Sequence, residues 1–201
     1  MPSLALFDFD GTLTTRDSFG DFFSFSSGKR RVAFAAAKAA GASLRSLRFD
    51  RGFLKEAMLS SLLGGVSYDF YLSMAKQYAD TRLDKIIRPS AVKTFSKHLS
   101  RKDSVYVVTA SMKEWIAFWA KRQSKDVIVI GTELEVDEGG VLTGRLATPN
   151  CRGAEKVARI RKAVDLSRYS EIYAYGDSGG DREMLALADY PVYRWREVPE
   201  L

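Results

Sequence analysis

Hydrophobic residues follow two different periods along the chain, and the change between them divides it into segments. Residues 4–7 form a short apolar run that ends in Asp8-Phe9-Asp10-Gly11-Thr12, which is typical of a buried strand with acidic residues in the loop after it. From 18 to 88 there is no strand alternation, and apolar residues recur at three- and four-residue steps. This pattern predicts a helical insert, with the phenylalanines between 19 and 25 in its core.

Helical and strand patterns alternate after Pro89. The pattern predicts helices at 91–99, 113–122, 154–164 and 182–188, and strands at 105–108, 127–130, 172–175 and 192–193. Residues 134–136 and 141–146 flank a Glu-Gly-Gly turn signal and predict a β-hairpin. The alternation indicates an α/β fold, with a mostly parallel sheet covered by helices on both faces. We therefore expect a core made of residues 1–17 and 89–201, interrupted by the helical insert at 18–88.

Composition restricts the class of protein further. A chain of 201 residues fits one domain, or a core with a smaller insert, and fractions of 46% hydrophobic and 28% charged residues exclude wholesale disorder. Cys151 is the only cysteine, which excludes an intrachain disulfide and a cysteine-rich zinc site; a structural role is favoured over a nucleophilic one. The N-terminal residues do not read as a secretory signal, and the longest weakly polar stretch is too short to span a bilayer, so we expect a cytoplasmic protein.

The net charge of +6 and the pI of about 9.4 favour anionic partners. Basic residues gather in the insert, between Lys29 and Lys55. Two interpretations stay open: an ordinary solvated helical surface, or a surface that attracts anionic substrates or an anionic membrane, which would place the protein at the membrane periphery. No nucleic acid is expected, because no recognised binding motif accompanies the charge, and no obligate protein partner is inferred.

Polar residues with related chemistry follow the predicted strands. They are Asp8 and Asp10 after the first strand, Thr109 after 105–108, Lys156 at the start of a helix, and Asp177 with Asp181 after 172–175. In parallel sheets, ligands bind beyond the carboxyl ends of the strands. Carboxylate oxygens are the ligands that Mg²⁺ prefers, and a threonine and a lysine suit a phosphoryl group. The set therefore predicts phosphoryl transfer, with Asp8 as nucleophile and Asp10 as the acid and base.

In order and spacing, these segments resemble the motifs of the haloacid dehalogenase superfamily. The segments that carry the resemblance are Asp8-Phe9-Asp10-Gly11-Thr12, Val107-Val108-Thr109-Ala110-Ser111, Lys156, and Gly176-Asp177-Ser178-Gly179-Gly180-Asp181. The resemblance implies a Rossmann-like parallel sheet, Mg²⁺, and hydrolysis of phosphoric monoesters through an aspartyl-phosphate. The place of the insert is similar to that of the helical C1-type cap in the phosphoserine-phosphatase-like subfamily (type IB).

The resemblance also implies a role for each matching residue. The implied metal ligands are Asp8, Asp10 through its backbone carbonyl, Asp177 and Asp181. The implied contacts to the phosphate or substrate are those of Gly11, Asp17, Thr109, Ala110 and Lys156. Asp8, Asp10, Thr109 and Lys156 are the implied catalytic residues.

The implied substrate is a small phosphorylated metabolite such as a phosphoserine-like compound. Related enzymes place a glutamate about where Asp17 stands and an arginine in the cap, for which Arg51 and Lys55 are the counterparts; Gly180 replaces a common asparagine. Residues 16–22 and 193–196 are also similar to phosphatidylglycerophosphatase C, which makes a lipid phosphate phosphatase the alternative.

A different class of function is a non-catalytic phosphate-binding protein or a phospho-aspartate signalling module. Such receiver modules also combine aspartates, a threonine and a lysine on a parallel sheet, but the long insert argues against this class. His98 lies among polar residues, so we expect it on a solvated helix face and assign it no role.

Overall fold

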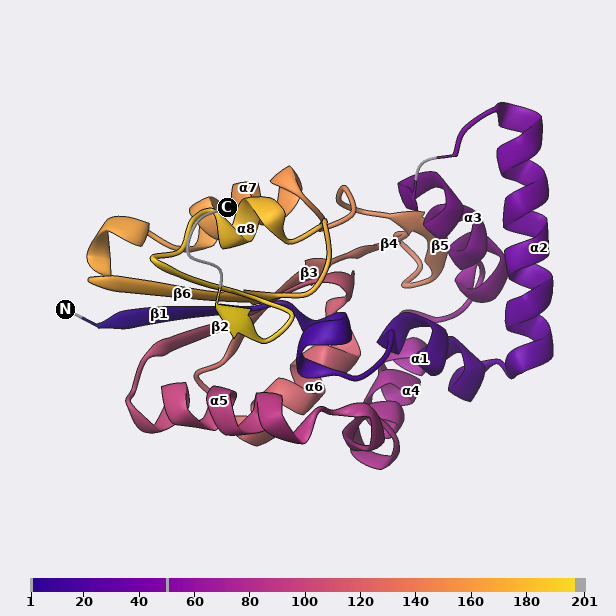
Figure 1. Cartoon of the computed structure of the whole chain (residues 1–201). Coiled ribbons are helices and arrows are strands. Elements are labelled where there is room, and N and C mark those ends of the chain that lie inside the picture. The colour runs from indigo at the N-terminus through magenta and orange to yellow at the C-terminus, as the bar shows by residue number, and fades with distance from the viewer. Residues whose placement is uncertain (1, 50, 198–201) are drawn as a thin grey trace.

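Among the described residues, a six-stranded sheet in the order β3-β2-β1-β6-β7-β8 forms the centre of the structure (Figure 1). The computed structural model describes residues 2–49 and 51–197, except the side chains of Arg51 and Glu197. The strands are β1 (Ser3–Phe7), β2 (Ser104–Met112), β3 (Ile128–Thr132), β6 (Glu171–Gly176), β7 (Tyr190–Tyr193) and β8 (Arg196–Glu197). All neighbouring pairs are parallel except β7 and β8. The predicted parallel α/β sheet is confirmed.

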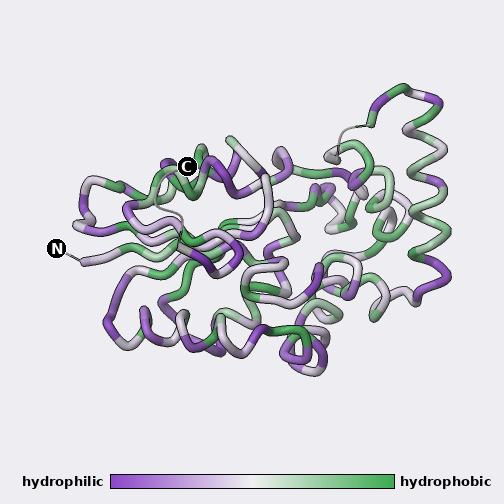
Figure 2. The backbone as a smooth tube through the Cα atoms, in the orientation of Figure 1, coloured by the Kyte–Doolittle hydropathy of each residue, from purple (hydrophilic) through white to green (hydrophobic). Residues whose placement is uncertain are grey.

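Helices cover both faces of the sheet. Successive residues of β1 point to opposite sides, so its side chains contribute to an apolar cluster on each face. Ala5 and Phe7 belong to one apolar cluster and Leu4 and Leu6 to the other, and all four side chains are fully buried. Helices α5 (Pro89–Ser100) and α6 (Lys113–Gln123) supply the first cluster, whereas α7 (Ala154–Ala163) and α8 (Arg182–Leu185) supply the second. Figure 1 shows these two pairs on opposite sides of the strands, and Figure 2 shows the hydrophobic residues concentrated between them.

The insert between β1 and β2 is helical, as its period predicts. It consists of α1 (Ser18–Ser26), α2 (Lys29–Ser46), α3 (Arg51–Leu63), α4 (Tyr68–Thr81) and a short 3₁₀ turn (Leu83–Ile86). The Asp17 side chain begins α1 by accepting the Gly20 N–H. Phe22 of α1 stacks on Trp115 of α6 with ring centroids 4.3 Å apart, so the insert and the sheet share one apolar cluster. The boundaries of the two parts at 18 and 88 stay a prediction.

The predicted hairpin exists, and it leaves the sheet to join the helical insert. Strands β4 (Leu134–Val136) and β5 (Leu142–Leu146) pair antiparallel. Leu142 exchanges backbone hydrogen bonds with the turn after α3: it accepts from the Gly65 N–H and donates to the Val66 carbonyl. In Figure 1 the hairpin lies beside α3. This contact between distant segments was not among the predictions from the sequence.

Two elements differ from their predicted bounds by three residues or more at one end, and one strand was not predicted. Strand β2 continues four residues beyond the predicted 108, with a shift of register against β3 between Val108 and Met112. Helix α8 ends at Leu185 instead of 188. Strand β8 was not predicted, since it depends on a turn at Arg194 and Trp195, both with positive φ. None of the helices in the described part of the chain is long and apolar enough to cross a membrane.

The expectation of a solvated His98 is wrong. The side chain is buried, with 3% of the residue exposed, because α5 turns it together with Ala91 and Phe95 toward the sheet. Its Nδ1 lies 2.7 Å from Asp103 and its Nε2 lies 2.8 Å from the Tyr175 hydroxyl. Burial lowers the pKa of His98. The histidine therefore joins α5 to β6 in the interior.

Candidate active site

Asp8 leaves the carboxyl end of the central strand, between the ends of β2 and β6. Its N–H donates to the Tyr175 carbonyl of β6, which extends the strand pairing by one residue. A tight loop, Phe9–Leu13, follows, closed by the Thr14 N–H donating to the Phe9 carbonyl, and brings the Thr12 hydroxyl to Asp8 Oδ2 at 3.1 Å. The carboxylate is nearly enclosed, with 6% of the residue exposed. Burial raises the pKa of Asp8 to about 7, against the opposing charge of Lys156.

Lys156, in the first turn of α7, is the cation of this group. Its Nζ donates to Asp8 Oδ1 at 2.6 Å, to Asp181 Oδ1 at 2.7 Å and to the Val108 carbonyl at 2.7 Å. The residue is 1% exposed, so all its polar atoms depend on these partners. Burial opposes its charge, but the two carboxylates raise its pKa, so Lys156 keeps its proton. The predicted lysine thus contacts the predicted nucleophile.

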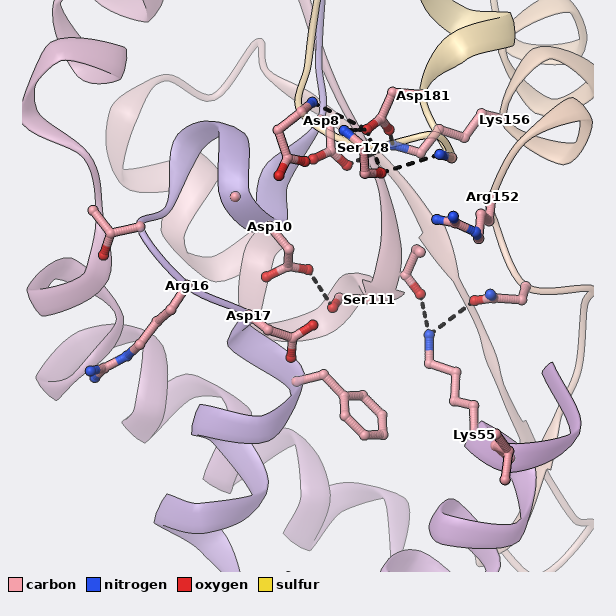
Figure 3. Close-up of a pocket in the computed structure, with 18 of the residues that line it drawn as sticks. Asp8, Asp10, Arg16, Asp17, Lys55, Ser111, Arg152, Lys156, Ser178 and Asp181 are labelled. Atoms are coloured by element: carbon pink, nitrogen blue, oxygen red, sulfur yellow. Dashed lines mark hydrogen bonds and ion pairs between the residues drawn. The ribbon is translucent and has the colours of Figure 1, made fainter. Parts of the chain in front are cut away.

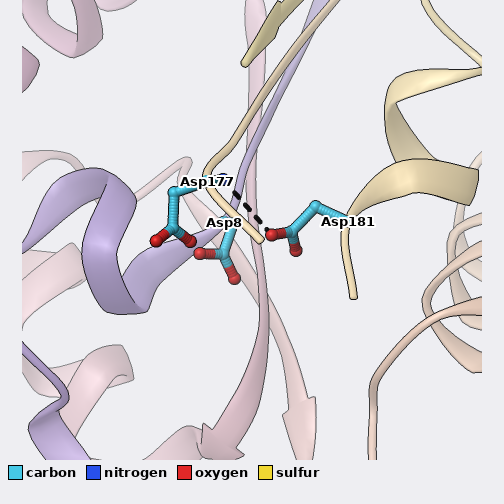
Figure 4. A group of neighbouring side chains, drawn as sticks. All are labelled: Asp8, Asp177 and Asp181. Carbon is cyan, nitrogen blue, oxygen red and sulfur yellow. Dashed lines mark hydrogen bonds between the residues drawn. The ribbon is translucent and has the colours of Figure 1, made fainter. Parts of the chain in front are cut away.

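Three carboxylates form a group that could hold a cation (Figure 4). Asp8, Asp177 and Asp181 each offer an oxygen within 4.8 Å of the others. Asp177 is half-buried, and burial followed by the charge of Asp181 raises its pKa. A bound divalent cation would offset both the burial of Asp177 and its repulsion by Asp181. Three carboxylate oxygens with room for water suit Mg²⁺. The residues therefore fit the implied metal.

The members of this group are not equally free to bind a metal. Both oxygens of Asp181 are used: Oδ1 accepts from Lys156, and Oδ2 accepts from the Ser178 hydroxyl at 2.9 Å and from the Ser178 N–H at 3.0 Å. Burial opposes its charge, yet Lys156 lowers the pKa of Asp181. Asp8 also accepts on both oxygens, from Lys156 and from Thr12, so by this measure Asp177 is the most available ligand, and Asp181 holds the lysine and the loop around it.

Gly11 provides the space in which Asp177 lies. Its φ is +85°, and a Cβ at this position would lie 2.2 Å from Asp177 Oδ2. The Gly11 N–H, implied by resemblance to contact phosphate, instead donates to the Thr14 hydroxyl at 3.0 Å. The visible reason for a glycine here is the approach of the Asp177 carboxylate to the backbone.

The Asp10 side chain points away from the three carboxylates and into the same cavity (Figure 3). Its Oδ1 accepts the Ser18 N–H, and its Oδ2 accepts the Ser111 hydroxyl, each at 2.6 Å. Burial raises the pKa of Asp10, and the nearby charge of Asp17 raises it further. A carboxyl with a raised pKa is better suited to protonating a leaving group than one with an ordinary pKa. The Asp10 carboxylate is not one of the three grouped carboxylates, and the implied contact of its backbone carbonyl to the metal stays a prediction.

Thr109 and Ala110 lie in the part of β2 where the register shifts. Thr109 is fully buried, and its hydroxyl accepts the Ser111 N–H at 3.0 Å; its side chain does not line the cavity. Ala110 and Ser111 form the wall instead. The implied phosphate contact of Thr109 stays a prediction, and the residue visibly shapes the backbone beneath that wall.

The carboxylates open into a cavity of about 610 Å³ between the sheet and the insert. Asp17 lines it, although one of its oxygens is used to begin α1. Lys55 enters from α3: its Nζ donates to the Ala110 carbonyl, and to Asn150 Oδ1 at 2.9 Å. Burial lowers the pKa of Lys55 to about 8, although Asp10 and Asp17 act in the other direction. Of the two counterparts of the cap arginine, Lys55 is the one in the cavity, and the side chain of Arg51 lies outside the described residues.

Residues that the motifs do not include complete the site. Arg152 lines the cavity beside Gly180, and a Cβ on Gly180 would lie 2.1 Å from its guanidinium (Figure 3). Arg194 Nε donates to the Asp177 carbonyl at 3.0 Å, and Trp195 Nε1 donates to the Thr12 carbonyl at 3.2 Å. The turn after β7 thus holds both acidic loops. The sequence held two signals for these residues: the glycine at 180 in place of an asparagine, and the similarity of residues 193–196 to phosphatidylglycerophosphatase C.

The chain is similar in sequence to known proteins over most of its length. The family model described as haloacid dehalogenase-like hydrolase matches residues 5–186. Protein CicA of Caulobacter vibrioides is 36% identical over 197 residues, which cover 96% of this chain and 86% of CicA.

Two solved structures have similar folds. A crystal structure of a protein of unknown function from Bordetella pertussis superposes with a TM-score of 0.79 at 25% identity, over 96% of this chain and 90% of the other. A probable phosphoserine phosphatase from Vibrio cholerae superposes with a TM-score of 0.67 at 15% identity, over 96% of this chain and 56% of the other.

Proposed function

The chain belongs to the haloacid dehalogenase-like hydrolase family, and from this premise we propose that it is a Mg²⁺-dependent phosphatase that hydrolyses phosphomonoesters through an aspartyl-phosphate at Asp8. The observation that carries the proposal is the arrangement around that residue. Asp8 lies within 2.6 Å of a buried lysine, beside Asp177, and in the same cavity as a carboxyl with a raised pKa. The structural neighbour from Vibrio cholerae, named as a probable phosphoserine phosphatase, supports the phosphatase class.

The first half of the proposed reaction forms the aspartyl-phosphate. A carboxylate oxygen of Asp8 attacks phosphorus, the bond between phosphorus and the ester oxygen breaks, and Asp10 gives its proton to that oxygen. Lys156 stays protonated and stabilises charge on the transferring oxygens. When bound by Asp8 and Asp177, Mg²⁺ supplies positive charge that lowers the repulsion between the carboxylate and the phosphoryl group.

The second half of the reaction reverses the role of Asp10. Now ionised, Asp10 takes a proton from a water molecule whose oxygen attacks phosphorus, and the bond between phosphorus and Asp8 breaks. Phosphate leaves, and both aspartates return to their initial states. The hydrogen bonds from Ser18 and Ser111 hold the Asp10 carboxyl in one orientation through both steps.

For the substrate, we propose a small phosphomonoester that carries charges of both signs, such as a phosphoserine-like compound. The cavity presents a carboxylate, Asp17, together with two cations, Lys55 and Arg152. A substrate ammonium would lie near Asp17, and a substrate carboxylate would lie near Lys55 and Arg152. Phe19, Leu54 and Met58 also line the cavity, which keeps a lipid phosphate as the alternative substrate.

The test is phosphate release with and without Mg²⁺ over a panel of phosphoserine, a sugar phosphate, a nucleotide and phosphatidylglycerophosphate. We expect turnover that requires Mg²⁺ and is lost in Asp8→Asn, with phosphoserine preferred. A preference for the lipid phosphate would replace the proposed substrate and keep the phosphatase. Turnover that survives both the removal of Mg²⁺ and the Asp8→Asn substitution would contradict the mechanism.

A further inference from the structure

The face of α2 that points away from the rest of the protein carries exposed apolar side chains. Ala35, Ala39 and Ser43 are the buried residues of this helix, and they lie on one side of it. The opposite side, by the 3.6-residue period, carries the exposed Phe34, Ala37 and Leu44, together with the exposed Arg30 and the half-buried Gly41. Phe34 is 69% exposed and Leu44 is 65% exposed. In Figure 1, α2 is the outermost element of the insert.

The apolar face continues past the end of the helix. Leu47, in the left-handed conformation with φ of 54°, is 79% exposed, and Phe49 is 63% exposed. Large apolar side chains that lie singly on a surface are ordinary, but four occur here along one helix and the turn that follows it. We call Phe34, Leu44, Leu47 and Phe49 the α2 strip.

All the excess positive charge of the protein lies around this strip. Six basic residues and no acidic residue occur between 22 and 49: Lys29, Arg30, Arg31, Lys38, Arg45 and Arg48. Since the chain has 31 basic and 25 acidic residues, the rest of it is electrically balanced. Figure 2 shows hydrophilic segments at both ends of α2, beside its apolar turns.

We propose that the α2 strip docks the protein on an anionic lipid bilayer. A helix with an apolar face bordered by lysine and arginine binds in the plane of a membrane interface, with the apolar face in the acyl boundary and the cations among the headgroups. At 18 residues α2 is about 27 Å long, enough to lie along such a surface. The inference does not depend on the proposed reaction.

The shape and charge of the strip favour a bilayer over a protein partner. The helix is a convex ridge, and alanines separate its large side chains, so it offers no pocket in which a partner could anchor. A fluid surface adapts to a ridge without a matching groove. A second copy of this chain would bring two sets of six positive charges together. An anionic bilayer complements both the apolar strip and the cations.

The test is sedimentation of the full chain with vesicles of phosphatidylcholine alone or mixed with phosphatidylglycerol. We expect binding to the mixed vesicles that is at least about tenfold stronger than to the neutral ones and that weakens with salt. The paired substitution Phe34→Ser with Leu44→Ser should abolish the binding, and Arg30→Glu with Arg45→Glu should do the same. All four sites are exposed, so the variants should fold. Hydrolysis of a soluble phosphomonoester at the rate of the unchanged protein would show that they are folded; if no phosphomonoester is hydrolysed, thermal unfolding would show it.

Matched controls lie elsewhere on the surface. Phe70→Ser removes a phenyl ring that is 61% exposed on α4, outside the strip, and Lys93→Glu with Lys121→Glu reverses two exposed charges outside the insert. These variants should bind the mixed vesicles nearly as well as the unchanged protein.

Three results would overturn the proposal. The first is no binding to anionic vesicles by the unchanged protein. The second is binding that survives Phe34→Ser with Leu44→Ser. The third is a concentration-dependent dimer in sedimentation equilibrium that the same pair of substitutions dissociates, which would assign the strip to a contact between copies.

Discussion

Replacement of Gly11 by alanine should weaken Mg²⁺ binding and activity in a protein that still folds. The added Cβ would lie 2.2 Å from Asp177 Oδ2, whereas ordinary contact begins at 3.4 Å, so the carboxylate must move by about 1 Å. A displacement of this size at reacting groups costs roughly 100-fold in rate. We expect Gly11→Ala to lower kcat/KM for phosphomonoesters by about that factor, and to weaken Mg²⁺ binding by at least about tenfold.

Gly65→Ala is the matched control for this substitution. Gly65 has nearly the same φ, +81°, but a Cβ there has no atom within 4 Å. Both variants should lose about 1–2 kcal/mol of unfolding free energy, because alanine is strained at positive φ. Only Gly11→Ala should lose Mg²⁺ affinity and activity. Calorimetric titration with Mg²⁺, urea unfolding and phosphate release measure the three quantities.

The reasoning would be refuted if Gly11→Ala kept Mg²⁺ affinity and kcat/KM within a few-fold of Gly65→Ala. That result would mean that Asp177 can move without consequence. The three-carboxylate group would then not be the metal site.

Three other changes test separate contacts. Lys156→Met should destabilise the protein by about 3–5 kcal/mol in urea unfolding, because it leaves two buried carboxylates without their cation; a loss below about 1 kcal/mol would contradict this. Since the pKa of Lys55 is lowered to about 8, its charge is present below that pH and lost above it. The KM for an anionic phosphomonoester should therefore rise between about pH 7 and about pH 9.5. In the Lys55→Met variant, KM should be nearly constant over the same range. An equal rise in both would exclude Lys55 as a substrate contact. Trp195→Phe removes the N–H given to the Thr12 carbonyl and keeps a ring, so it should cost about 1 kcal/mol of unfolding free energy, and no loss would refute that role.

The sequence predicted the sheet and the positions of the acidic residues because both depend on local patterns. Short apolar runs in an alternation of strands and helices identify parallel strands, and polar residues at the ends of such strands lie at one edge. The sequence pattern alone therefore predicted that Asp8, Asp177 and Lys156 lie close together. The same logic failed for His98, whose polar neighbours hid its position on the face shared with Ala91 and Phe95.

Contacts made by the rest of the site could not be predicted, because they join segments far apart in the chain. The Ser111 hydroxyl reaches Asp10 only because the register of β2 shifts at its end. Arg152 fills the space left by Gly180, a relation between two loops that no spacing reveals. The turn at Arg194 and Trp195 needs positive φ at two residues without the usual glycine, so it carried no turn signal.

The most direct test of the central claim is to locate the phosphoryl group on the protein during turnover. The protein is mixed with Mg²⁺ and a hydrolysed phosphomonoester, quenched, and treated with borohydride, which reduces an aspartyl-phosphate to homoserine; peptide mass spectrometry then finds the changed residue. The account predicts homoserine at position 8, absent without Mg²⁺ and absent in Asp8→Asn. Modification at a different residue, or rapid turnover with position 8 unchanged, would contradict it.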